Sequence, residues 1–322
     1  MNNPHEICTE LFSIVIPNYK RTFELKRAID SVLCQAGYDD LIEKIIIVDD
    51  KSENIDEIER LIDSYNCDKI LLIKNDFKSN AAYTRNQGAR AAGAEWICFL
   101  DSDDTFTSTK IVELSRFVSS DIDVVYNKAL VYFDGVLDDI VPHRPLGENE
   151  DISEYLFTSK EYMQTSTLTV RKSFFNNYGF NENYKRHQDY DLCLTFQQVG
   201  LRLAFLNIPC TNIMWGGGER PMMKGESYEY SMNWLNENRE RITNVAYDGF
   251  YWSFIVVKAA RNLNKIKSIK YFIGMNKRSL SVKNLLVYLI ILSIPSVLQH
   301  KFYLAYKRLN TYERKNKSNI TP

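Results

Sequence analysis

The chain has 322 residues and a mass of 37.6 kDa, and its 45% hydrophobic and 25% charged residues exclude disordered and collagen-like proteins. Its 40 basic and 41 acidic residues leave a net charge of −1. From Lys258 onward there are 14 basic residues and one acidic residue, a net charge of +13, so residues 1–257 carry −14. A long segment of one sign favours binding to an anionic partner.

The cysteines and the first residues of the chain favour a cytosolic protein. Six Cys residues are scattered without a C-x-x-C pair, and Cys34, Cys98 and Cys193 stand among apolar neighbours. We therefore expect reduced, buried thiols. Glu6 and Glu10 flank short apolar stretches where a signal peptide would have a basic and then an apolar region, so secretion is not expected.

Short apolar segments alternate with helical patterns over about the first 105 residues. We expect strands at 12–17, 44–48, 69–73 and 96–100, and helices at 22–34, 55–62 and 81–92. This alternation predicts right-handed βαβ units and a mostly parallel sheet. The next region is less regular, with expected strands at 124–126, 129–133 and 166–170 and a helix at 190–199 closed by Gly200.

Three of the first four strands end in polar residues. The first is followed by Asn18 to Arg21, the second by Asp49-Asp50 and the fourth by Asp101 to Asp104. Because ligands of such sheets lie beyond the carboxyl ends of the strands, we expect these residues to converge on one crevice.

The sequence Asp101-Ser102-Asp103 places carboxylates so close together that a cation or bound protons have to compensate their repulsion. Hard oxygen ligands suit Mg²⁺ or Mn²⁺, and a site with few protein ligands leaves coordination positions for phosphate oxygens. The alternative is that Asp104 caps the helix expected after Ser108. The position after an apolar strand favours a metal–diphosphate site.

Five short motifs follow one another between residues 12 and 215. They are Ser13-Ile14-Val15-Ile16-Pro17-Asn18-Tyr19-Lys20-Arg21, Ile47-Val48-Asp49-Asp50-Lys51-Ser52, Thr84-Arg85-Asn86-Gln87-Gly88, Phe99-Leu100-Asp101-Ser102-Asp103-Asp104, and Gly179-Phe180-Asn181-Glu182 with Gln188-Asp189-Tyr190-Asp191. In this order they resemble glycosyltransferase family 2, whose enzymes have the GT-A fold. The resemblance implies an α/β protein with a mostly parallel, Rossmann-like central sheet flanked by helices.

The resemblance also implies a nucleotide-sugar site. Asp50 would hydrogen-bond the uracil edge, and Asp101 would lie near the ribose or the donor sugar. Asp103 would bind the Mn²⁺ or Mg²⁺ ion that bridges the diphosphate. The residues implied in nucleotide-sugar binding are Pro17, Asn18, Tyr19, Arg21, Asp50, Arg85, Asp101, Ser102 and Asp103.

Several of these residues have simpler alternatives. Arg21 is alternatively a solvated residue at a helix start, and Asp49 or Asp50 a cap for the following helix. Arg85 is alternatively a surface partner of Glu95.

Asp189 resembles the catalytic base of the family. A sugar hydroxyl is a poor nucleophile at neutral pH, and a positioned carboxylate can take its proton while the new bond forms. A helix N-terminus would favour the ionised carboxylate, and a metal ion would stabilise the departing diphosphate. One in-line displacement should invert the anomeric carbon. The alternative is that Asp189 caps the helix at 190–199, a position for which Asp191 is better suited.

The chain departs from the family pattern at three places. Gln188 replaces the acid that usually precedes the base, which removes a charge beside Asp189, and Asn80 stands where a Gly is common. Trp215-Gly216-Gly217-Gly218 suggests a mobile lid with Arg220 as a phosphate contact, or an ordinary linker. A Q-x-x-R-W motif is missing, and there is no multi-span hydrophobic region, which argues against a processive synthase.

Residues 285–298 form a mostly apolar stretch interrupted by Pro295, shorter than the ~20 residues that a spanning helix needs. Basic and aromatic residues flank it, which favours an interfacial helix on an anionic cytoplasmic leaflet. The alternatives are packing against the catalytic domain and a single short span.

These observations predict three regions: a nucleotide-sugar-binding half (1–110), an acceptor and base half (111–225), and a helical, basic, membrane-associating region (226–322). The resemblance implies a non-processive enzyme on the cytoplasmic face of the inner membrane. It would move a hexose, Gal or Glc first, from a UDP-sugar to an undecaprenyl-diphosphate-linked saccharide in bacterial O-antigen or capsule assembly. No nucleic-acid partner is expected.

Two other functions remain open. A metal-dependent nucleotidyltransferase also needs carboxylates and phosphates, but it would be expected to have a Gly-rich loop after the first strand, and residues 17–21 lack Gly. The other is a non-catalytic membrane-associated protein that binds nucleotides or sugars.

Overall fold

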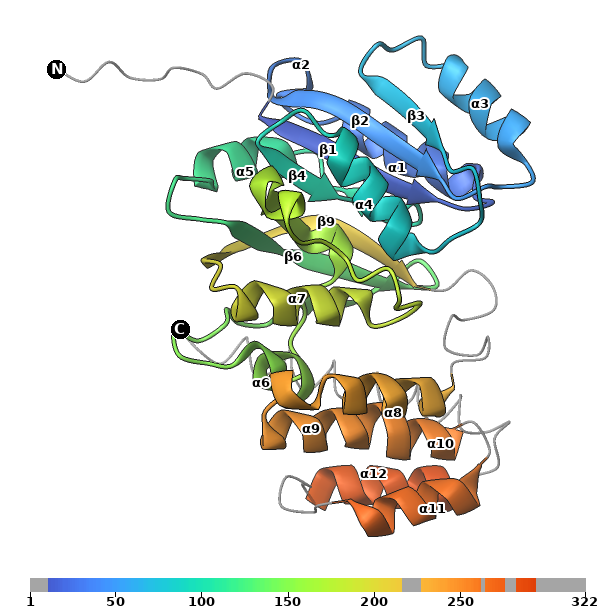
Figure 1. Ribbon diagram of the computed structural model, residues 1–322, viewed down its shortest axis with the longest axis vertical. Coiled ribbons are helices and arrows are strands. Elements are labelled where there is room, and N and C mark those ends of the chain that lie inside the picture. Colours follow the sequence, from blue (N-terminus) through green and yellow to red (C-terminus); the bar gives the residue numbers. More distant parts are fainter. Residues whose placement is uncertain (1–10, 216–226, 262–263, 276–281, 294–322) are drawn as a thin grey trace, which may run out of the picture. The chain divides into compact units, whose positions relative to one another are not determined.

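The computed structural model describes residues 11–215, 227–261, 264–275 and 282–293 (Figure 1). The chain forms two compact units. Unit 1 comprises Met1–Gly147 and Glu161–Gly217, and unit 2 comprises Glu148–Lys160 and Gly218–Pro322. The expected lid at 216–218, Arg220, and the basic residues after 293 lie outside the described residues.

Unit 1 is built on a mixed sheet whose order is β3-β2-β1-β4-β8-β6-β9-β5, with β7 paired to β6. The first four strands are β1 (Phe12–Asn18), β2 (Ile42–Asp49), β3 (Ile70–Lys74) and β4 (Trp96–Phe99). They pair in parallel, β1 lying between β2 and β4. The α/β class and the parallel arrangement predicted for this part of the chain are therefore confirmed.

The remaining strands extend the sheet with mixed directions. They are β5 (Thr105–Phe106), β6 (Val124–Phe133), β7 (Val136–Val141), β8 (Leu168–Arg171) and β9 (Leu203–Trp215). The two strands expected at 124–126 and 129–133 are one strand, β6, which pairs in parallel with β9 through two register shifts. The sequence pattern does not predict β9, because polar residues in this strand interrupt the hydrophobic alternation. Ser166 belongs to a 3₁₀ turn, η1 (Thr165–Thr167), that precedes β8.

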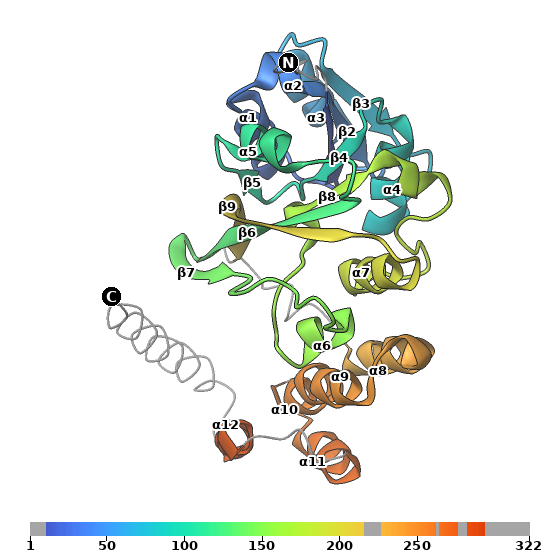
Figure 2. The ribbon, with the colours of Figure 1, turned by 90° about the vertical axis from the view of Figure 1, so that its left-hand side faces the viewer.

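Helices cover both faces of this sheet (Figures 1 and 2). One face carries α1 (Phe23–Leu33), α3 (Ile55–Asp63) and α5 (Lys110–Phe117), and the other carries α4 (Ala81–Ala91) and α7 (Gln188–Gln198). Successive residues of β1 point to opposite faces: Ile14 and Ile16 join the core cluster of α1, whereas Val15 contacts Gly88 of α4. Burial on both faces explains the continuous apolar run of β1. The short elements are α2 (Tyr38–Leu41) and η2 (Lys172–Asn176).

Unit 2 is helical. It contains α6 (Ile152–Phe157), α8 (Tyr228–Glu237), η3 (Arg239–Arg241), α9 (Asn244–Phe250), the π-helix η4 (Tyr251–Val256), α10 (Val257–Arg261), α11 (Lys265–Gly274) and α12 (Val282–Ser293). Phe157 of α6 lies edge-on to Trp234 and Phe250, with ring centroids 6.1 and 5.0 Å apart. A second cluster joins Trp252, Tyr288 and their neighbours in η4, α10, α11 and α12.

Two expectations about cysteines and membranes can be compared with the structure. Cys98 and Cys193 are buried free thiols, as expected, but Cys34 is exposed because it lies just beyond the last turn of α1. Among the described residues, every helix is too short or too polar to cross a membrane.

Candidate functional site

The ends of β1 and β2 are held together by Asp49. Its carboxylate accepts hydrogen bonds from Asn18 Nδ2 (3.2 Å) and from the backbone N (2.7 Å) and Oγ (2.6 Å) of Ser52. Asp49 thus fixes the turn after β2, while α3 begins farther on, after Asn54, without a side-chain cap. This local role accounts for Asp49 and leaves Asp50 available for another one.

Asp50 is buried beneath the loop between β3 and α4. Its Oδ1 accepts hydrogen bonds from Ser79 N (2.8 Å), Ser79 Oγ (2.6 Å) and Asn75 Nδ2 (3.2 Å), and its Oδ2 forms an ion pair with Lys78. Burial alone would raise the pKa of Asp50, but the bonds from Lys78 and Ser79 outweigh it and lower the pKa. Asp50 is therefore an ionised, oriented acceptor and caps no helix.

Tyr19 presents its ring beside Asp50. The ring is 39% exposed, and Lys78 Nζ lies 3.4 Å from its centroid. Lys20 and Lys51, which follow β1 and β2, have left-handed backbones with φ of 59° and 58°. Ser52 Oγ accepts a hydrogen bond from Lys20 N (2.7 Å) and stabilises this conformation. Such strained backbones at strand ends are common where side chains must be aimed at a ligand.

The loop after β4, which comprises residues 101–104 and is called the acidic loop below, faces Arg21. Arg21 Nη1 lies 2.9 Å from Asp103 Oδ2 and 3.4 Å from Ser102 Oγ. Desolvation raises the pKa of Asp103, Arg21 opposes this and Asp101 adds to it. Arg21 is therefore paired with the acidic loop and is not merely a solvated residue at the start of α1.

Asp104 is buried under the same loop. Its Oδ2 accepts hydrogen bonds from Ser166 Oγ (2.7 Å) and Gln164 Nε2 (3.3 Å), and its Oδ1 accepts one from Met214 N (3.1 Å). Gln164 Nε2 also lies 3.2 Å from Asp101 Oδ2, and Ser166 Oγ accepts a hydrogen bond from Asp101 N (3.0 Å). Gln164 and Ser166 thus fix both ends of the acidic loop.

The capping alternative for Asp104 is wrong, because α5 begins after Thr109, whose side chain makes no cap either. Desolvation and the neighbouring Asp103 and Asp101 raise the pKa of Asp104 to about 8. Gln164 and Ser166 were not predicted as site residues, because their only signal in the sequence is a polar segment directly before an apolar strand.

Arg85 links the acidic loop to the start of α7. Its Nη2 lies 2.5 Å from Asp101 Oδ1, and its Nη1 donates to Gln188 Oε1 at 2.8 Å. The side chain is 7% exposed, so it is not the surface partner of Glu95, which pairs with Arg171 instead. Gln188, the departure from the family pattern, is therefore a neutral acceptor for Arg85.

Asp189 lies in the first turn of α7, which begins two residues earlier than expected. The N-cap position is His187, whose left-handed backbone (φ 59°) provides no side-chain cap. Asp189 is thus not the cap; its Oδ1 accepts a hydrogen bond from Tyr190 N at 3.0 Å. Desolvation raises its pKa to about 6, although Tyr190 N and Arg85 oppose the shift.

The structure brings most of the predicted residues to one edge of the sheet. Pro17, by contrast, is buried within β1 and pairs in register with Val48. It therefore contributes to the strand that positions Asn18 and Tyr19, and its own side chain does not line the edge. The residues whose side chains line this edge are Asn18, Tyr19, Arg21, Asp50, Arg85, Asp101, Ser102, Asp103 and Asp189.

In the part of the chain that the structure describes, no three His, Cys, Asp or Glu side chains converge as a ready metal cage. The acidic loop nevertheless suits a cation. Burial, with repulsion from neighbouring carboxylates, raises the pKa values of Asp103 and Asp104, and a bound cation would favour their ionised forms. The donor set is carboxylate oxygen, which Mg²⁺ and Mn²⁺ prefer.

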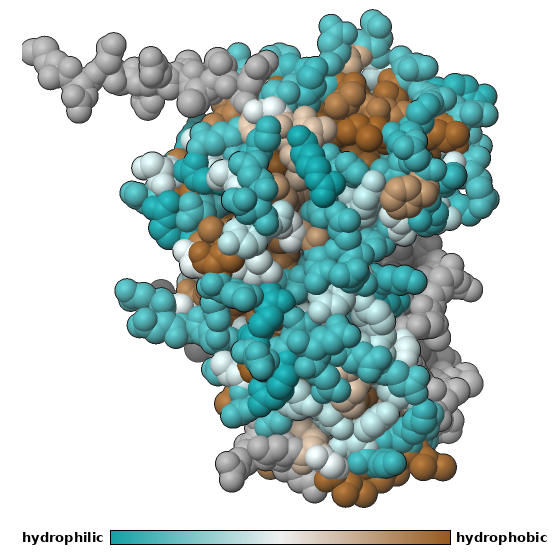
Figure 3. Space-filling model, in the orientation of Figure 1, coloured by the Kyte–Doolittle hydropathy of each residue, from teal (hydrophilic) through white to brown (hydrophobic). Residues whose placement is uncertain are grey.

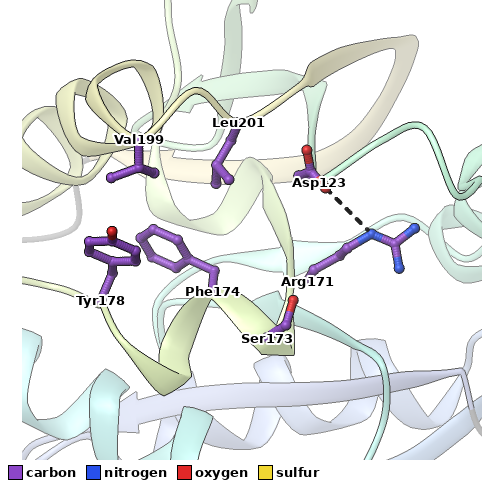
Figure 4. A pocket seen from close by; sticks show the side chains of 7 residues that line it. All are labelled: Asp123, Arg171, Ser173, Phe174, Tyr178, Val199 and Leu201. Carbon is purple, nitrogen blue, oxygen red and sulfur yellow. Dashed lines mark ion pairs between the residues drawn. The ribbon is translucent and has the colours of Figure 1, made fainter.

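A separate hollow lies elsewhere in unit 1 (Figure 4). It has a volume of about 210 Å³, and Asp123, Arg171 and Phe174 are among its lining residues. Arg171 pairs in register with Trp96, the first residue of β4, so the hollow lies at the edge opposite to the acidic loop. We therefore assign it no part in the candidate site.

The fold and this polar edge define a class of protein. The structure of TarS from S. aureus, residues 1–349 in complex with UDP-GlcNAc, superposes with a TM-score of 0.61 at 17% identity, covering 82% of this chain and 78% of that one. The chain therefore has the GT-A fold.

The family model named Glycosyl transferase family 2 matches residues 13–184, and the chain belongs to this family. It is 32% identical over 240 residues to the amylovoran biosynthesis glycosyltransferase AmsB of Erwinia amylovora, covering 72% of this chain and 79% of that protein. It is 28% identical over 202 residues to the UDP-Glc:alpha-D-GlcNAc-diphosphoundecaprenol beta-1,3-glucosyltransferase WfaP of Escherichia coli, covering 62% and 75%. It is thus a glycosyltransferase related to bacterial polysaccharide enzymes.

Proposed function

We propose that the protein transfers a hexose, with inversion, from a UDP-sugar to a lipid-linked saccharide in surface-polysaccharide assembly. The observation that carries the proposal is Arg85, which joins Asp101 of the acidic loop to Gln188 in the first turn of α7. Through it, Asp101, proposed to lie near the donor, is joined to the residue directly before Asp189, the proposed base.

The donor half of the site fits a uridine diphosphate. Asp50 is ionised and oriented, so it can accept the N3–H of uracil, and Tyr19 beside it offers a ring face for the base. The related TarS fold was solved in complex with UDP-GlcNAc, which supports this donor class.

The acidic loop would hold the diphosphate through a divalent cation. Asp103 is the proposed ligand for Mn²⁺ or Mg²⁺, which when bound neutralises charge on the leaving diphosphate. Arg21 lies 2.9 Å from Asp103 and is half-exposed, so its guanidinium can turn from the carboxylate to a phosphate oxygen. Gln164 and Ser166 keep the loop in place while Arg21 changes partner.

Asp189 is the proposed general base. Its pKa of about 6 leaves it mostly ionised at neutral pH and close enough to neutrality to take a proton from an acceptor hydroxyl. The hydroxyl oxygen attacks C1 of the donor sugar as the C1–O bond to the diphosphate breaks, and the proton passes to Asp189. One displacement from the opposite side gives inversion.

The acceptor proposal comes from relatives. The name of WfaP specifies a GlcNAc-diphosphoundecaprenol acceptor and glucose transfer, and AmsB is named for amylovoran biosynthesis. These names favour an undecaprenyl-diphosphate-linked acceptor and glucose as the sugar. Galactose as the other candidate sugar, and a place on the cytoplasmic face of the inner membrane, belong to the proposal through the family resemblance.

The transfer proposal is tested with Asp189→Asn. We expect UDP release from UDP-Glc or UDP-Gal, in the presence of Mn²⁺ and a lipid-linked acceptor, to fall by about 100-fold or more, because general-base catalysis contributes ~10²–10⁴. UDP with Mn²⁺ should still raise the melting temperature as in the wild type. Asp191→Asn in the same helix is the matched control. Transfer that survives Asp189→Asn would contradict the assignment of the base.

Membrane attachment is proposed for the exposed aliphatic residues of α11 and α12 in unit 2. The hydroxyls of Ser268 and Tyr288 meet at 2.8 Å on the buried sides of α11 and α12. The opposite side of each helix exposes aliphatic residues. We name these the apolar face: Ile266, Ile269 and Ile273 of α11, and Val282, Leu286, Leu289 and Ile290 of α12.

The apolar face has the composition of an interfacial surface. Ile266 is 84% exposed and Val282 is 75% exposed, and Figure 3 shows hydrophobic atoms gathered over α11. Exposed Lys270 adjoins it, within the segment of net charge +13. Apolar side chains with basic neighbours suit insertion into an anionic leaflet.

Substitution of two isoleucines tests this surface. We expect Ile266→Ser with Ile273→Ser to lower binding to phosphatidylglycerol-containing vesicles by about tenfold or more, because each buried aliphatic side chain contributes ~1.5–3 kcal/mol. Val136→Ser in β7 is the control, because Val136 and Ile273 have the same exposed fraction, 68%. If the double variant sediments with vesicles like the wild type, the apolar face is not the attachment surface; the oligomeric state would then show whether a second copy covers it.

A further inference from the structure

Lys78 stands between the two residues proposed to bind the base. Its Nζ lies 3.4 Å from the centroid of the Tyr19 ring and forms an ion pair with Asp50 Oδ2. Tyr19 and Asp50 are far apart in sequence and come from the ends of β1 and β2, which are neighbours in the sheet. The ammonium group therefore contacts the ring face and the carboxylate at the same time.

A uracil base needs the same two contacts. Its flat face stacks on an aromatic ring, and its N3–H requires an acceptor at its edge. A base that stacked on the Tyr19 face now covered by Lys78, with its N3–H directed at Asp50, would overlap Lys78 Nζ. We infer that Lys78 is an internal competitor of the base: it imitates the N–H donor and has to leave before the donor nucleotide binds. This inference rests on the proposed donor site.

Lys78 can leave towards solvent, because its side chain is 46% exposed. The Asp50 side chain is only 5% exposed, so the base has to replace the contact that Lys78 gives up. Asp50 keeps three other hydrogen bonds, from the backbone and hydroxyl of Ser79 and from Asn75. Release of Lys78 therefore frees an acceptor that is already oriented.

The contact has a consequence for affinity. Every nucleotide that uses Tyr19 and Asp50 first has to break the Lys78 contacts, so the measured affinity is lower than the subsite alone would give. A base with an N–H donor restores the lost bond to Asp50. Because the ion pair is partly exposed, salt weakens it and should make the base subsite easier to enter.

Lys78→Met tests the inference, because methionine keeps a long, flexible chain without the ammonium. Uridine and UDP are the two probes, since uridine carries the base without phosphates. We expect both to bind Lys78→Met about threefold to tenfold tighter than the wild type. Added NaCl should strengthen uridine binding to the wild type and leave binding to the variant unchanged. Calorimetry, or competition with UDP, measures these affinities.

Lys20→Met is the matched control. Lys20 Nζ lies 5.2 Å from the same ring centroid, but its ion partner is Glu53, on the exposed surface. This variant should bind uridine like the wild type.

Unchanged or weaker uridine binding by Lys78→Met would overturn the inference, and weaker binding would show that Lys78 holds the nucleotide. A gain for UDP without a gain for uridine would also overturn it, because the effect would then lie at the phosphates. If the wild type binds neither probe, the donor site itself is wrong and the inference falls with it.

Discussion

Asp189 and Gln188 together determine how the proposed base responds to pH. As a general base, Asp189 would act in its ionised form, and desolvation raises its pKa to about 6. The value of kcat/KM should therefore rise with pH through about 6 and reach a plateau above it. Gln188, which accepts a hydrogen bond from Arg85, keeps the preceding position neutral.

Gln188→Glu should move this rise to higher pH. A second carboxylate beside Asp189 disfavours its ionised form, although Arg85 offsets part of the effect. At pH 6 we expect kcat/KM to fall several-fold, while the plateau at high pH changes less. The pH profile of kcat/KM measures the shift.

Gln188→Met provides a neutral comparison. It removes the hydrogen bond with Arg85 without adding charge, so it should reduce the plateau and leave the position of the rise unchanged. If Gln188→Glu gives the same profile as Gln188→Met, electrostatic control of Asp189 by this position is refuted.

Sequence analysis could place the acidic residues but not all of their partners. Asp50 and Asp101 lie at one edge because each follows a parallel strand, and the carboxyl ends of parallel strands meet at the same edge of a sheet. Gln164 and Ser166 come from a turn that reaches the acidic loop only through antiparallel pairing of β8 with β4. Neither periodicity nor a local motif encodes that long-range pairing.

At the scale of elements, α4 lies unusually close to the sheet. A Cβ atom added to Gly88 would lie 2.4 Å from Val15 Cγ1 and 3.2 Å from Val48 Cγ2, side chains of the neighbouring strands β1 and β2. Glycine at this point lets the helix that carries Arg85 approach those strands.

We expect Gly88→Ala to destabilise unit 1 by about 1–3 kcal/mol, because overpacking outweighs the gain in helix propensity of ~1 kcal/mol. Urea unfolding followed by circular dichroism measures the change. Ala91→Ser, on the exposed side of α4, should stay within about 0.5 kcal/mol of the wild type. An unchanged midpoint for Gly88→Ala would show that α4 can move away from β1 without cost.

Elements with a simple period were predictable, and those with mixed environments were not. β1 and β2 are covered on both faces and appear as continuous apolar runs. β9 alternates buried, half-buried and exposed residues over 13 positions and shifts register against β6, so no single period describes it. The buried Thr211 lies in β9, where its hydroxyl donates to Ser166 O at 3.0 Å.

At the scale of the whole molecule, the acidic and basic parts of the sequence fall mainly into different structural units. The acidic loop and Asp189 belong to unit 1, and the apolar face belongs to unit 2. The proposed sugar transfer and the proposed membrane attachment can therefore be separated by substitution, since the Ile266 and Ile273 variants leave every residue of the candidate site unchanged.

The path of the chain between the units also matters for synthesis. Residues 148–160 belong to unit 2, although residues on both sides of them belong to unit 1. Phe157 of α6 can therefore form its contacts with Trp234 and Phe250 only after those residues have been synthesised. At ~5–20 residues per second this takes several seconds. During that time Phe157 lacks the contacts with these two rings.

A shortened chain that ends after residue 217 should therefore not be a stable, active protein. It contains all of the proposed site residues but leaves α6 permanently without Trp234 and Phe250, so we expect it to aggregate or be degraded. Soluble yield and size-exclusion profiles measure this. Phe157→Ser and Leu156→Ser should partly restore solubility to the shortened chain, and no gain from them would mean that α6 is not the cause. We therefore expect that chains whose synthesis stops before unit 2 are removed by proteolysis, even though they contain every residue of the proposed site.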